Sequence, residues 1–306
     1  SFLIKAFISV IPFYFILKNI DLSNVINLIR NLGWDYIAIS ISILFIQIIL
    51  MSHRWKVVLD NLGMDLIFKD VIKIFWIGLF FNQVLPSSIG GDSFRGFYIY
   101  RKGFSLVETT QGVLVDRIIG LLALVILVII TLPLGLGLIE NNNAKLGLIT
   151  ILTFAILGLI TLLNLDKFMI FFKDWKFYDP IMSITIKIRE IIYSKKPGLK
   201  LLSISLLVHF LSILTVLCLS KGMGLDIEFK GIILIIPLVT LLMMIPISIA
   251  GWGVREGAMI VGLGFLGVEA ESAFALSLIF GFISLLVSVP GGPIWILING
   301  NIKQSF

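Results

Sequence analysis

Charged residues, cysteine and histidine are scarce in this 306-residue chain. Its one cysteine, Cys218, excludes an internal disulfide framework and a thiolate metal cluster. The two histidines, His53 and His209, form no HxxxH pair, so neither a metal site nor a cofactor is expected. Charged residues make up only 14% of the chain, which is too few for the solvated surface of an ordinary soluble domain.

Apolar residues dominate the sequence instead, at 58% of the chain and with a mean hydropathy of +1.09. Long apolar runs with short polar connections predict an all-α polytopic membrane protein, with one transmembrane domain over residues 1–306. The plasma membrane is the expected location. Most of the lysines and arginines behind the net charge of +6 lie between apolar runs, where they act as topology signals and contacts to anionic lipid. Nucleic acid is therefore not expected as a partner.

One interruption of the apolar sequence occurs twice. Residues 85–96 read LPSSIGGDSFRG and residues 245–257 read IPISIAGWGVREG. Pro, Ser, Ile, a small residue, Gly and Arg recur in one register, from Pro86 and Pro246 to Arg95 and Arg255. These matches in an unbroken register indicate an internal repeat.

The lengths of the apolar runs separate spans from shorter limbs, because a helix needs about 20 residues to cross a bilayer. Each repeated motif joins two limbs that are too short, 71–85 with 92–100 and 231–245 with 254–268. Each pair is predicted to be a re-entrant helical hairpin whose break faces protein or a cavity. His, Arg, Trp and Lys at 53–56 are expected at the membrane interface. Spans are predicted at 2–17, 36–52, 106–133, 146–164, 201–220 and 272–298, with a polar link at 18–35 and an interruption at 290–293.

The distribution of positive charge predicts sidedness. Residues 166–200 carry eight lysines and arginines against four acids, so this basic loop is expected in the cytoplasm, with an amphipathic interfacial helix at 179–193. Counting crossings from this loop places both termini in the cytoplasm and makes the two hairpins enter from opposite sides. The halves, about 36–133 and about 201–298, are therefore predicted to be inverted repeats.

The repeated break has the composition of an anion site. A helix that starts at the break presents unpartnered backbone N–H groups and partial positive charge. In the first copy Gly90 and Gly91 allow close approach of a ligand, Ser88 and Asp92 can cap the helix, and Arg95 lies one turn further on. In the second copy Ser248, Gly251 and Arg255 supply similar groups. Two helix N-termini and two arginines near the midplane suit a phosphate-bearing headgroup.

The same residues could instead have structural roles. The glycines equally suit close helix approach. A cation at membrane depth must be paired or line water, so Arg95 is expected to pair with Asp92, and Arg255 with Glu256, or either with Asp116. The dipeptide Asp116-Arg117 is either an internal ion pair or part of a proton or substrate path. Asn82 is placed to bond the broken backbone. His209 has two possible roles: it packs or forms a hydrogen bond within the protein, or it takes part in proton coupling.

Four ordered motifs resemble one family. They are Asn82-x-x-Leu85-Pro86-Ser87-x-x-Gly90-Gly91-Asp92-x-x-Arg95, then Asp116-Arg117-x-x-Gly120, then Pro246-x-Ser248-x-x-Gly251-x-Gly253-x-Arg255-Glu256-Gly257, and Pro290-Gly291-Gly292. Over nearly the whole chain they are similar to the lysylphosphatidylglycerol synthase transmembrane family, a UPF0104-type module like the flippase portion of the multiple peptide resistance factors. The resemblance implies movement of an anionic lipid between leaflets. It implies functional positions at Asn82, Gly91, Asp92, Arg95, Asp116, Arg117, Arg255 and Glu256.

Three hypotheses follow. The leading one is a flippase or transporter, not an enzyme, that moves an anionic phospholipid or a polyprenyl-phosphate-type lipid. A membrane-embedded enzyme acting on lipid phosphate is the alternative, with Asp92, Asp116 and Glu256 as available carboxylates. The third is a membrane partner of a separate glycosyltransferase or other lipid-modifying enzyme, with the basic loop at 166–200 as the docking surface.

Overall fold

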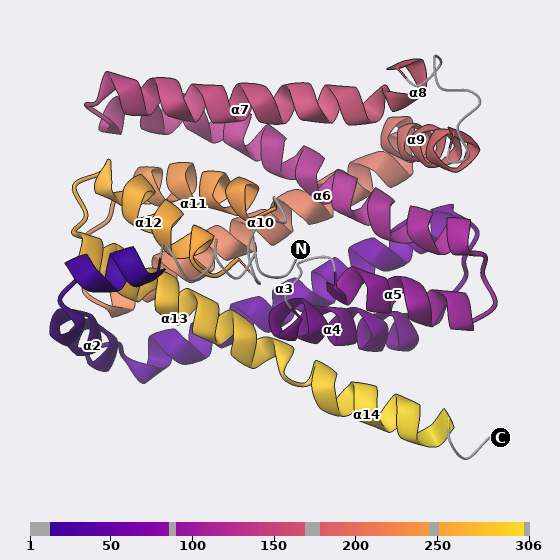
Figure 1. Cartoon of the computed structure of the whole chain (residues 1–306), viewed down its shortest axis with the longest axis horizontal. Helices are drawn as coiled ribbons and strands as arrows, with labels where there is room; N and C mark the ends of the chain where they lie inside the picture. Colours follow the sequence, from indigo (N-terminus) through magenta and orange to yellow (C-terminus); the bar gives the residue numbers. More distant parts are fainter. Residues whose placement is uncertain (1–12, 86–89, 169–177, 245–250, 303–306) are drawn as a thin grey trace.

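The computed structural model describes residues 13–85, 90–168, 178–244 and 251–302, and within these every regular element is helical (Figure 1). Five helices of the described part are long and apolar enough to cross a membrane. The chain is therefore a multi-pass, all-α membrane protein, as predicted. The five are α3 (Trp34–Asn61), α6 (Leu106–Gly135) with the 3-10 turn η1 (Leu136–Leu138), α7 (Asn142–Leu163), α10 (Lys195–Gly222), and α13 (Ala270–Ser288) with α14 (Gly291–Ile302).

Four shorter helices contain the repeated motifs. Helix α4 (Phe68–Val84) packs on α5 (Gly90–Arg101), and α11 (Phe229–Met243) packs on α12 (Val254–Gly264). The first pair lies at one end of the long axis and the second pair at the other end, while α3, α6 and α10 run between the two ends (Figure 1). The predicted short limbs agree with these helices to within a few residues.

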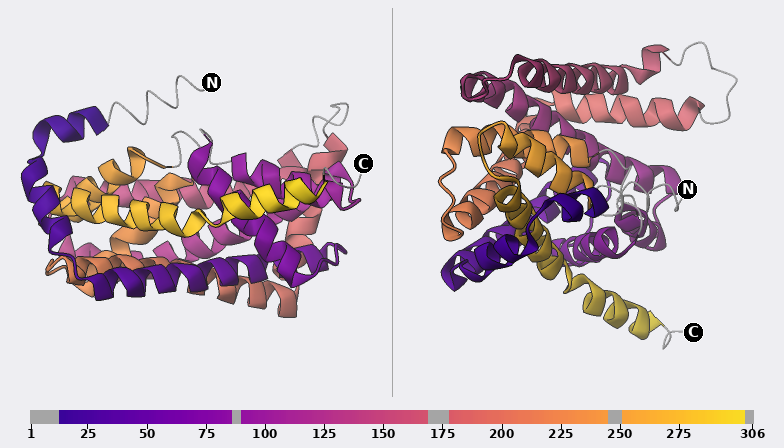
Figure 2. Two further views of the ribbon diagram at one scale, coloured as in Figure 1. Left: turned by 90° about the horizontal axis from the view of Figure 1, so that it is seen from below. Right: turned by 60° about the vertical axis from the view of Figure 1, so that its left-hand side comes forward.

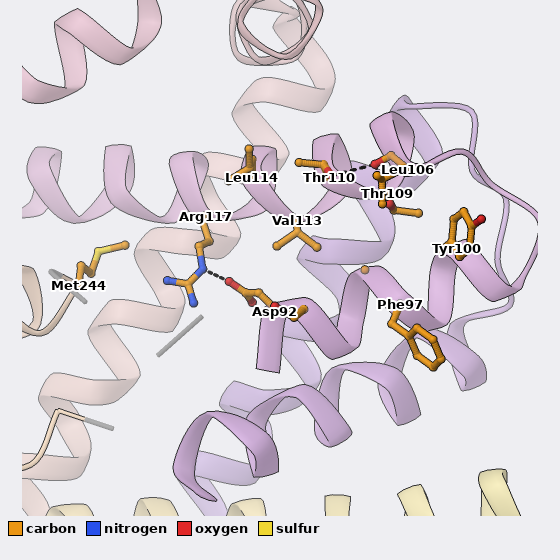
Figure 3. Close-up of a pocket in the computed structure, with 12 residues that line it drawn as sticks. Asp92, Phe97, Tyr100, Leu106, Thr109, Thr110, Val113, Leu114, Arg117 and Met244 are labelled. Carbon is orange, nitrogen blue, oxygen red and sulfur yellow. Dashed lines mark hydrogen bonds and ion pairs between the residues drawn. The ribbon is translucent and has the colours of Figure 1, made fainter. Parts of the chain in front are cut away.

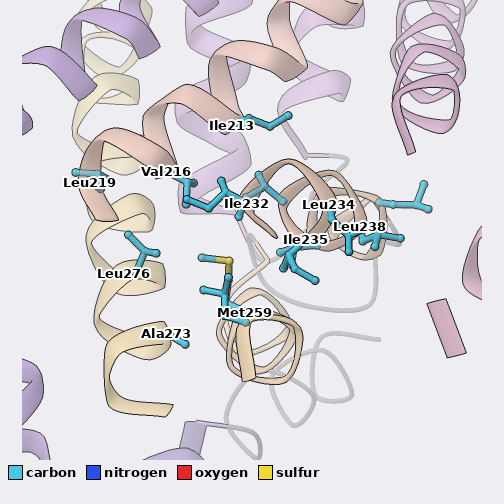
Figure 4. Close-up of a cluster of buried hydrophobic side chains, with 14 of the residues drawn as sticks. Ile213, Val216, Leu219, Ile232, Leu234, Ile235, Leu238, Met259, Ala273 and Leu276 are labelled. Carbon is cyan, nitrogen blue, oxygen red and sulfur yellow. The ribbon is translucent and has the colours of Figure 1, made fainter. Parts of the chain in front are cut away.

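Most of the apolar core surrounds the second pair. Figure 4 shows α11 and α12 held against α10 and α13 by aliphatic side chains. Ile213 and Leu219 of α10, Ile232 of α11 and Leu276 of α13 are among its fully buried members. A smaller cluster around Trp55 and Phe75 lies where α3, α4 and α5 meet. Both short pairs thus pack against long helices of the described chain.

The remaining helices lie at the periphery. The polar link predicted at 18–35 contains a helix, α2 (Leu22–Arg30), because Asp21 caps it by accepting a hydrogen bond from the Ser23 N–H (2.9 Å). Hydrogen bonds from Ser23 also lower the pKa of the Asp21 carboxyl. The interruption predicted at 290–293 is confirmed, since α13 ends at Ser288 and α14 begins at Gly291 and continues beyond the break in nearly the same direction (Figure 1).

The basic loop includes α8 (Leu165–Phe168) and α9 (Tyr178–Tyr193), the latter within one residue of the predicted amphipathic helix. The apolar face of α9 packs on α6 and α10, with Ile188 and Ile191 buried near Val115 and Leu201. Figure 2 shows α7 and α9 as a layer set to one side of the other helices. This face of α9 is therefore covered by protein.

Candidate functional site

The first motif brings α4 and α5 into close contact. A Cβ atom on Gly91 would lie 1.8 Å from the carbonyl oxygen of Gly78, so α5 reaches this position only because residue 91 is glycine. The Gly91 N–H donates to Asn82 Oδ1 (2.9 Å), which confirms that Asn82 bonds the broken backbone. Gly91 therefore serves the packing of α5 on α4, and its backbone N–H is already bonded by protein.

Five charged side chains from α3, α5 and α6 form one chain of ion pairs. Arg95 donates to Asp92 (3.2 Å) and to Asp116 (2.8 Å). Asp116 also accepts from Arg54 Nε (2.8 Å), and Asp92 accepts from Arg117 Nε. Both pairings of Arg95 agree with the sequence prediction. The order along the chain is Arg54, Asp116, Arg95, Asp92, Arg117, with signs that alternate.

This network holds three arginines against two aspartates, so it carries one positive charge in excess. Arg54, Arg95, Asp92 and Asp116 are all buried. The Arg95 guanidinium lies 4.1 Å from the ring centroid of Trp55 and 4.6 Å from that of Phe75, which stabilises the cation further. Its Nε–H has no hydrogen-bond partner among the residues that the structure describes. One buried donor of the network is thus unsatisfied by the described residues.

Arg54 and Trp55 were predicted at the membrane interface just beyond the span 36–52, but the structure continues this helix through both residues and buries their side chains. Arg54 is 5% exposed and Trp55 is fully buried, with its Nε1–H donating to the Gly112 carbonyl (3.1 Å). The error came from ending the span at the polar stretch after residue 52. The sequence held a signal against that boundary, because no glycine or proline interrupts residues 34–62 and the helix continues to Asn61.

A cavity of about 220 Å³ lies against the network. Arg54, Arg95, Asp92, Asp116 and Arg117 all line it. Asn82, Gly120, His209 and Thr240 complete its polar and backbone wall. His209 Nε2 lies 3.0 Å from the Gly120 carbonyl oxygen, as expected for a hydrogen-bonding histidine.

A larger groove of about 520 Å³ runs between α5 and α6 and reaches the same network (Figure 3). Its outer part is apolar and exposed, with Phe97, Tyr100 and Leu106 on the rim. Its inner end is the ion pair of Asp92 and Arg117, which also line the inner cavity. One ion pair therefore separates an apolar lateral groove from a charged interior.

The second motif forms a smaller, self-contained ion pair. Arg255 donates to Glu256 through Nη2 (2.5 Å) and Nε (3.0 Å), as predicted, and both residues are buried. Glu256 also accepts from the Gly253 N–H (2.6 Å). Arg255 lies 4.5 Å from the Trp252 ring centroid, and a Cβ on Gly281 would fall 2.0 Å from its Nη2. Like Arg95, this arginine sits beneath a tryptophan and against a helical glycine.

The two copies differ in where the new helix starts. Helix α5 begins at Gly90, at the glycine pair, whereas α12 begins at Val254. Gly251 and Gly253 both have φ of +83°, which a right-handed helix does not accommodate, so α12 begins four residues later in the shared register than α5 does. Arg255 therefore lies in the first turn of its helix and Arg95 in the second turn.

A third cavity of about 310 Å³ adjoins the second motif. Arg255 lines it, and Met51, Leu79, Asn82 and Thr240 belong to both this cavity and the one at Arg95. The structure thus places Asn82, Asp92, Arg95, Asp116, Arg117 and Arg255 around adjoining cavities. Gly90, Gly91 and Gly251 do not line these three cavities, and the predicted Ser88 and Ser248 lie outside the described residues. Among the described residues no group of His, Cys, Asp and Glu is arranged to hold a metal ion.

Comparison with known proteins agrees with this architecture. A UPF0104 membrane protein of Methanocaldococcus jannaschii is 29% identical over 119 residues, which cover 36% of this chain and 34% of that protein. A UPF0104 membrane protein of Methanothermobacter thermautotrophicus is 20% identical over 284 residues, covering 84% of this chain and 83% of that one. The match thus spans about a third of the first relative and most of the second. No solved structure matches the chain. The profile described as "Lysylphosphatidylglycerol synthase TM region" matches residues 2–292, and the chain belongs to that family.

Proposed function

We propose that this protein moves a lipid with an anionic headgroup from one leaflet of the membrane to the other. The observation that carries the proposal is the buried network at Arg95, which has one arginine in excess at the junction of an apolar lateral groove and an internal cavity. The four buried members balance in charge, and among the described residues the excess falls on the part-exposed Arg117 at the inner end of the groove. A cation at membrane depth is costly, so this end of the groove favours an incoming negative charge.

The two sides of the groove match the two parts of a lipid. Its apolar rim suits acyl chains that remain in the bilayer, and its inner end presents Arg117 to a phosphate. From there the cavity continues to Arg95, whose Nε–H is a further donor. A headgroup can therefore travel inward while its tails stay outside, which is the requirement for moving a lipid across a bilayer.

We propose further that the two short helix pairs are re-entrant hairpins of inverted repeats. At 1.5 Å per residue, the 17-residue α4 and the 15-residue α11 measure roughly 26 Å and 22 Å, against a hydrocarbon core of about 30 Å. The pairs lie at opposite ends of the molecule (Figure 1). The repeats then comprise about 36–133 and about 201–298, with the basic loop at 166–200 and both termini in the cytoplasm and the plasma membrane as the location.

The alternative functions gain less support. An enzyme acting on lipid phosphate requires a carboxylate free to take or give a proton. Asp92, Asp116 and Glu256 each accept hydrogen bonds from at least one arginine, so each carboxylate is already engaged by protein. Docking of a separate glycosyltransferase or lipid-modifying enzyme on the basic loop remains a prediction from charge alone.

Reconstitution in liposomes tests the proposal. The purified protein is incorporated with headgroup-labelled anionic phospholipids or polyprenyl phosphates, and exposure of the label in the outer leaflet is followed by chemical quenching. Arg95→Gln removes the excess charge but leaves Arg54 with Asp116 and Arg117 with Asp92, so the folded protein is expected to lose transport. Arg95→Lys keeps the charge and is expected to retain part of it. Equal rates in wild type and Arg95→Gln would refute the proposed role of the network.

A further inference from the structure

The cavity at Arg255 differs chemically from the cavity at Arg95, although the two share Asn82 and Thr240 in their walls. The cavity at Arg95 adjoins a net positive network. At Arg255 the charge is cancelled by Glu256, which accepts two hydrogen bonds from the guanidinium. The second cavity is therefore polar but has no excess charge with which to attract a second phosphate.

Its polar lining consists mainly of uncharged groups whose hydrogens are already engaged. Thr240 donates to the Ile236 carbonyl (2.8 Å), Ser284 to the Phe280 carbonyl (2.7 Å) and Ser288 to the Leu285 carbonyl (2.7 Å). Each of these hydroxyl groups then presents only an oxygen acceptor to the cavity.

Gln47, in the same wall, follows this pattern. Its amide nitrogen donates to Ser212 Oγ (2.7 Å) and to the Val208 carbonyl (3.1 Å). Beside the amide of Gln83, which can both donate and accept, the lining thus presents mostly acceptor oxygens, and these favour ligand groups that donate hydrogen bonds. Hydroxyl and ammonium groups both donate, but an ammonium would lie beside Arg255 and close to the excess positive charge at Arg95.

Asn82 connects the two environments. Its carbonyl oxygen is engaged by the Gly91 N–H, so its NH₂ group is the part left for a ligand, and the residue lines both cavities. A donor at the junction suits a phosphate held on the Arg95 side. The remainder of the same headgroup would then extend into the acceptor-rich cavity, whose volume of about 310 Å³ lies within the usual range for ligand pockets.

We infer that the cavity at Arg255 is a subsite for an uncharged, hydroxyl-bearing headgroup, such as a glycerol, inositol or sugar unit, attached to a phosphate that binds at Arg95. This inference rests on the proposed function for the phosphate side. It selects among anionic lipids those with one phosphate and a polyol, over bare phosphates, diphosphates and headgroups that end in an amine.

A headgroup series with identical acyl chains tests the subsite in nanodiscs and in liposomes. Phosphatidylglycerol and phosphatidylinositol are compared with phosphatidic acid and phosphatidylethanolamine, for binding by competition and for transport by initial rate. Two or three additional hydrogen bonds correspond to a preference of about tenfold or more for the hydroxylated lipids. Soluble glycerol 3-phosphate is included as a separate arm, and its binding without that of the lipids would assign the site to a free phosphate ester.

The double variant Ser284→Ala/Ser288→Ala removes two acceptors that line only the Arg255 cavity of the three described. It is expected to reduce the preference to about twofold while phosphatidic acid binds as in the wild type. Ser42→Ala/Ser220→Ala is the matched control, because these serines make the same bonds to helix carbonyls and line none of the three cavities described.

The outcomes separate this inference from the proposed function. Binding that prefers polyol headgroups, without movement between leaflets, would support the subsite and overturn transport. Movement without headgroup preference, or a preference that survives the Ser284→Ala/Ser288→Ala change, would overturn the subsite and leave transport standing. No binding of any lipid in the series would overturn both.

Discussion

The variants Arg95→Gln and Arg255→Gln should differ in what they lose. The first should impair transport, and the second should impair the stability of the fold. In Arg255→Gln, Glu256 stays fully buried and loses its cationic partner, keeping only the Gly253 N–H and the more distant Ser277 hydroxyl (3.4 Å). Breaking a buried ion pair in this way costs about 3–5 kcal/mol of folding free energy.

In Arg95→Gln no carboxylate is left without a partner, because Asp116 keeps Arg54 and Asp92 keeps Arg117. The loss is then limited to that of a charged hydrogen bond, about 1.5–3 kcal/mol, and relief of repulsion between the arginines reduces it. We therefore expect Arg95→Gln to fold and fail in transport, and Arg255→Gln to be deficient first in stability.

Thermal unfolding in detergent, followed by differential scanning fluorimetry, measures this difference. Arg255→Gln should melt roughly 10 °C below the wild type and clearly below Arg95→Gln. The double variant Arg255→Gln/Glu256→Gln removes both charges and should recover most of the loss, because a neutral pair leaves no buried charge. If Arg255→Gln were as stable as Arg95→Gln, or if the double variant were no better than the single one, the ion-pair reasoning would be refuted.

Three further substitutions test the packing around the site. Gly91→Ala should separate α4 from α5 and destabilise the protein by about 1–3 kcal/mol, whereas Gly96→Ala, where a Cβ meets open space, should be neutral in the same melting assay. Gly281→Ala should displace the Arg255 guanidinium and mimic loss of its ion pair with Glu256. Gly264→Ala is the control, because a Cβ at that position meets no atom within 4 Å. Asn82→Ala leaves a backbone N–H without its acceptor and should cost about 1–3 kcal/mol and slow transport, and wild-type values for both would contradict the junction role.

Much of the fold could be predicted from apolar run length and from the breaks between runs. The long spans from residue 36 on, the short limbs, the amphipathic helix at 179–193 and the interruption before α14 followed from those patterns. The span predicted at 2–17 lies mostly outside the described residues and stays a prediction. Helix ends were less predictable, because polarity does not end a helix. Residues 53–61 continue α3 because no glycine or proline ends the helix there. Their polar side chains can be buried because residues on other helices bond them, and the sequence does not show which residues these are.

Part of the site could also be predicted from the sequence. Arg95, Asp92, Asp116, Arg255 and Glu256 stand out as charges in apolar sequence, and their pairing follows from the cost of a buried charge. Arg54 was missed because its aspartate lies 62 residues away, on a helix whose orientation no local pattern specifies. The cavities were beyond prediction, since the two inner ones each depend on how six helices pack and the groove on how α5 lies against α6.

The sequence separation within the first network has a consequence for biosynthesis. Arg54 enters the membrane with α3 before Asp116 has been synthesised, and Arg95 and Asp92 follow in between. Arg54 is therefore neutralised only when α3 has associated with α6, whereas Arg95 can pair with Asp92 on its own helix, α5. Arg255 and Glu256 are adjacent on α12, so this ion pair needs no second helix to supply its partner.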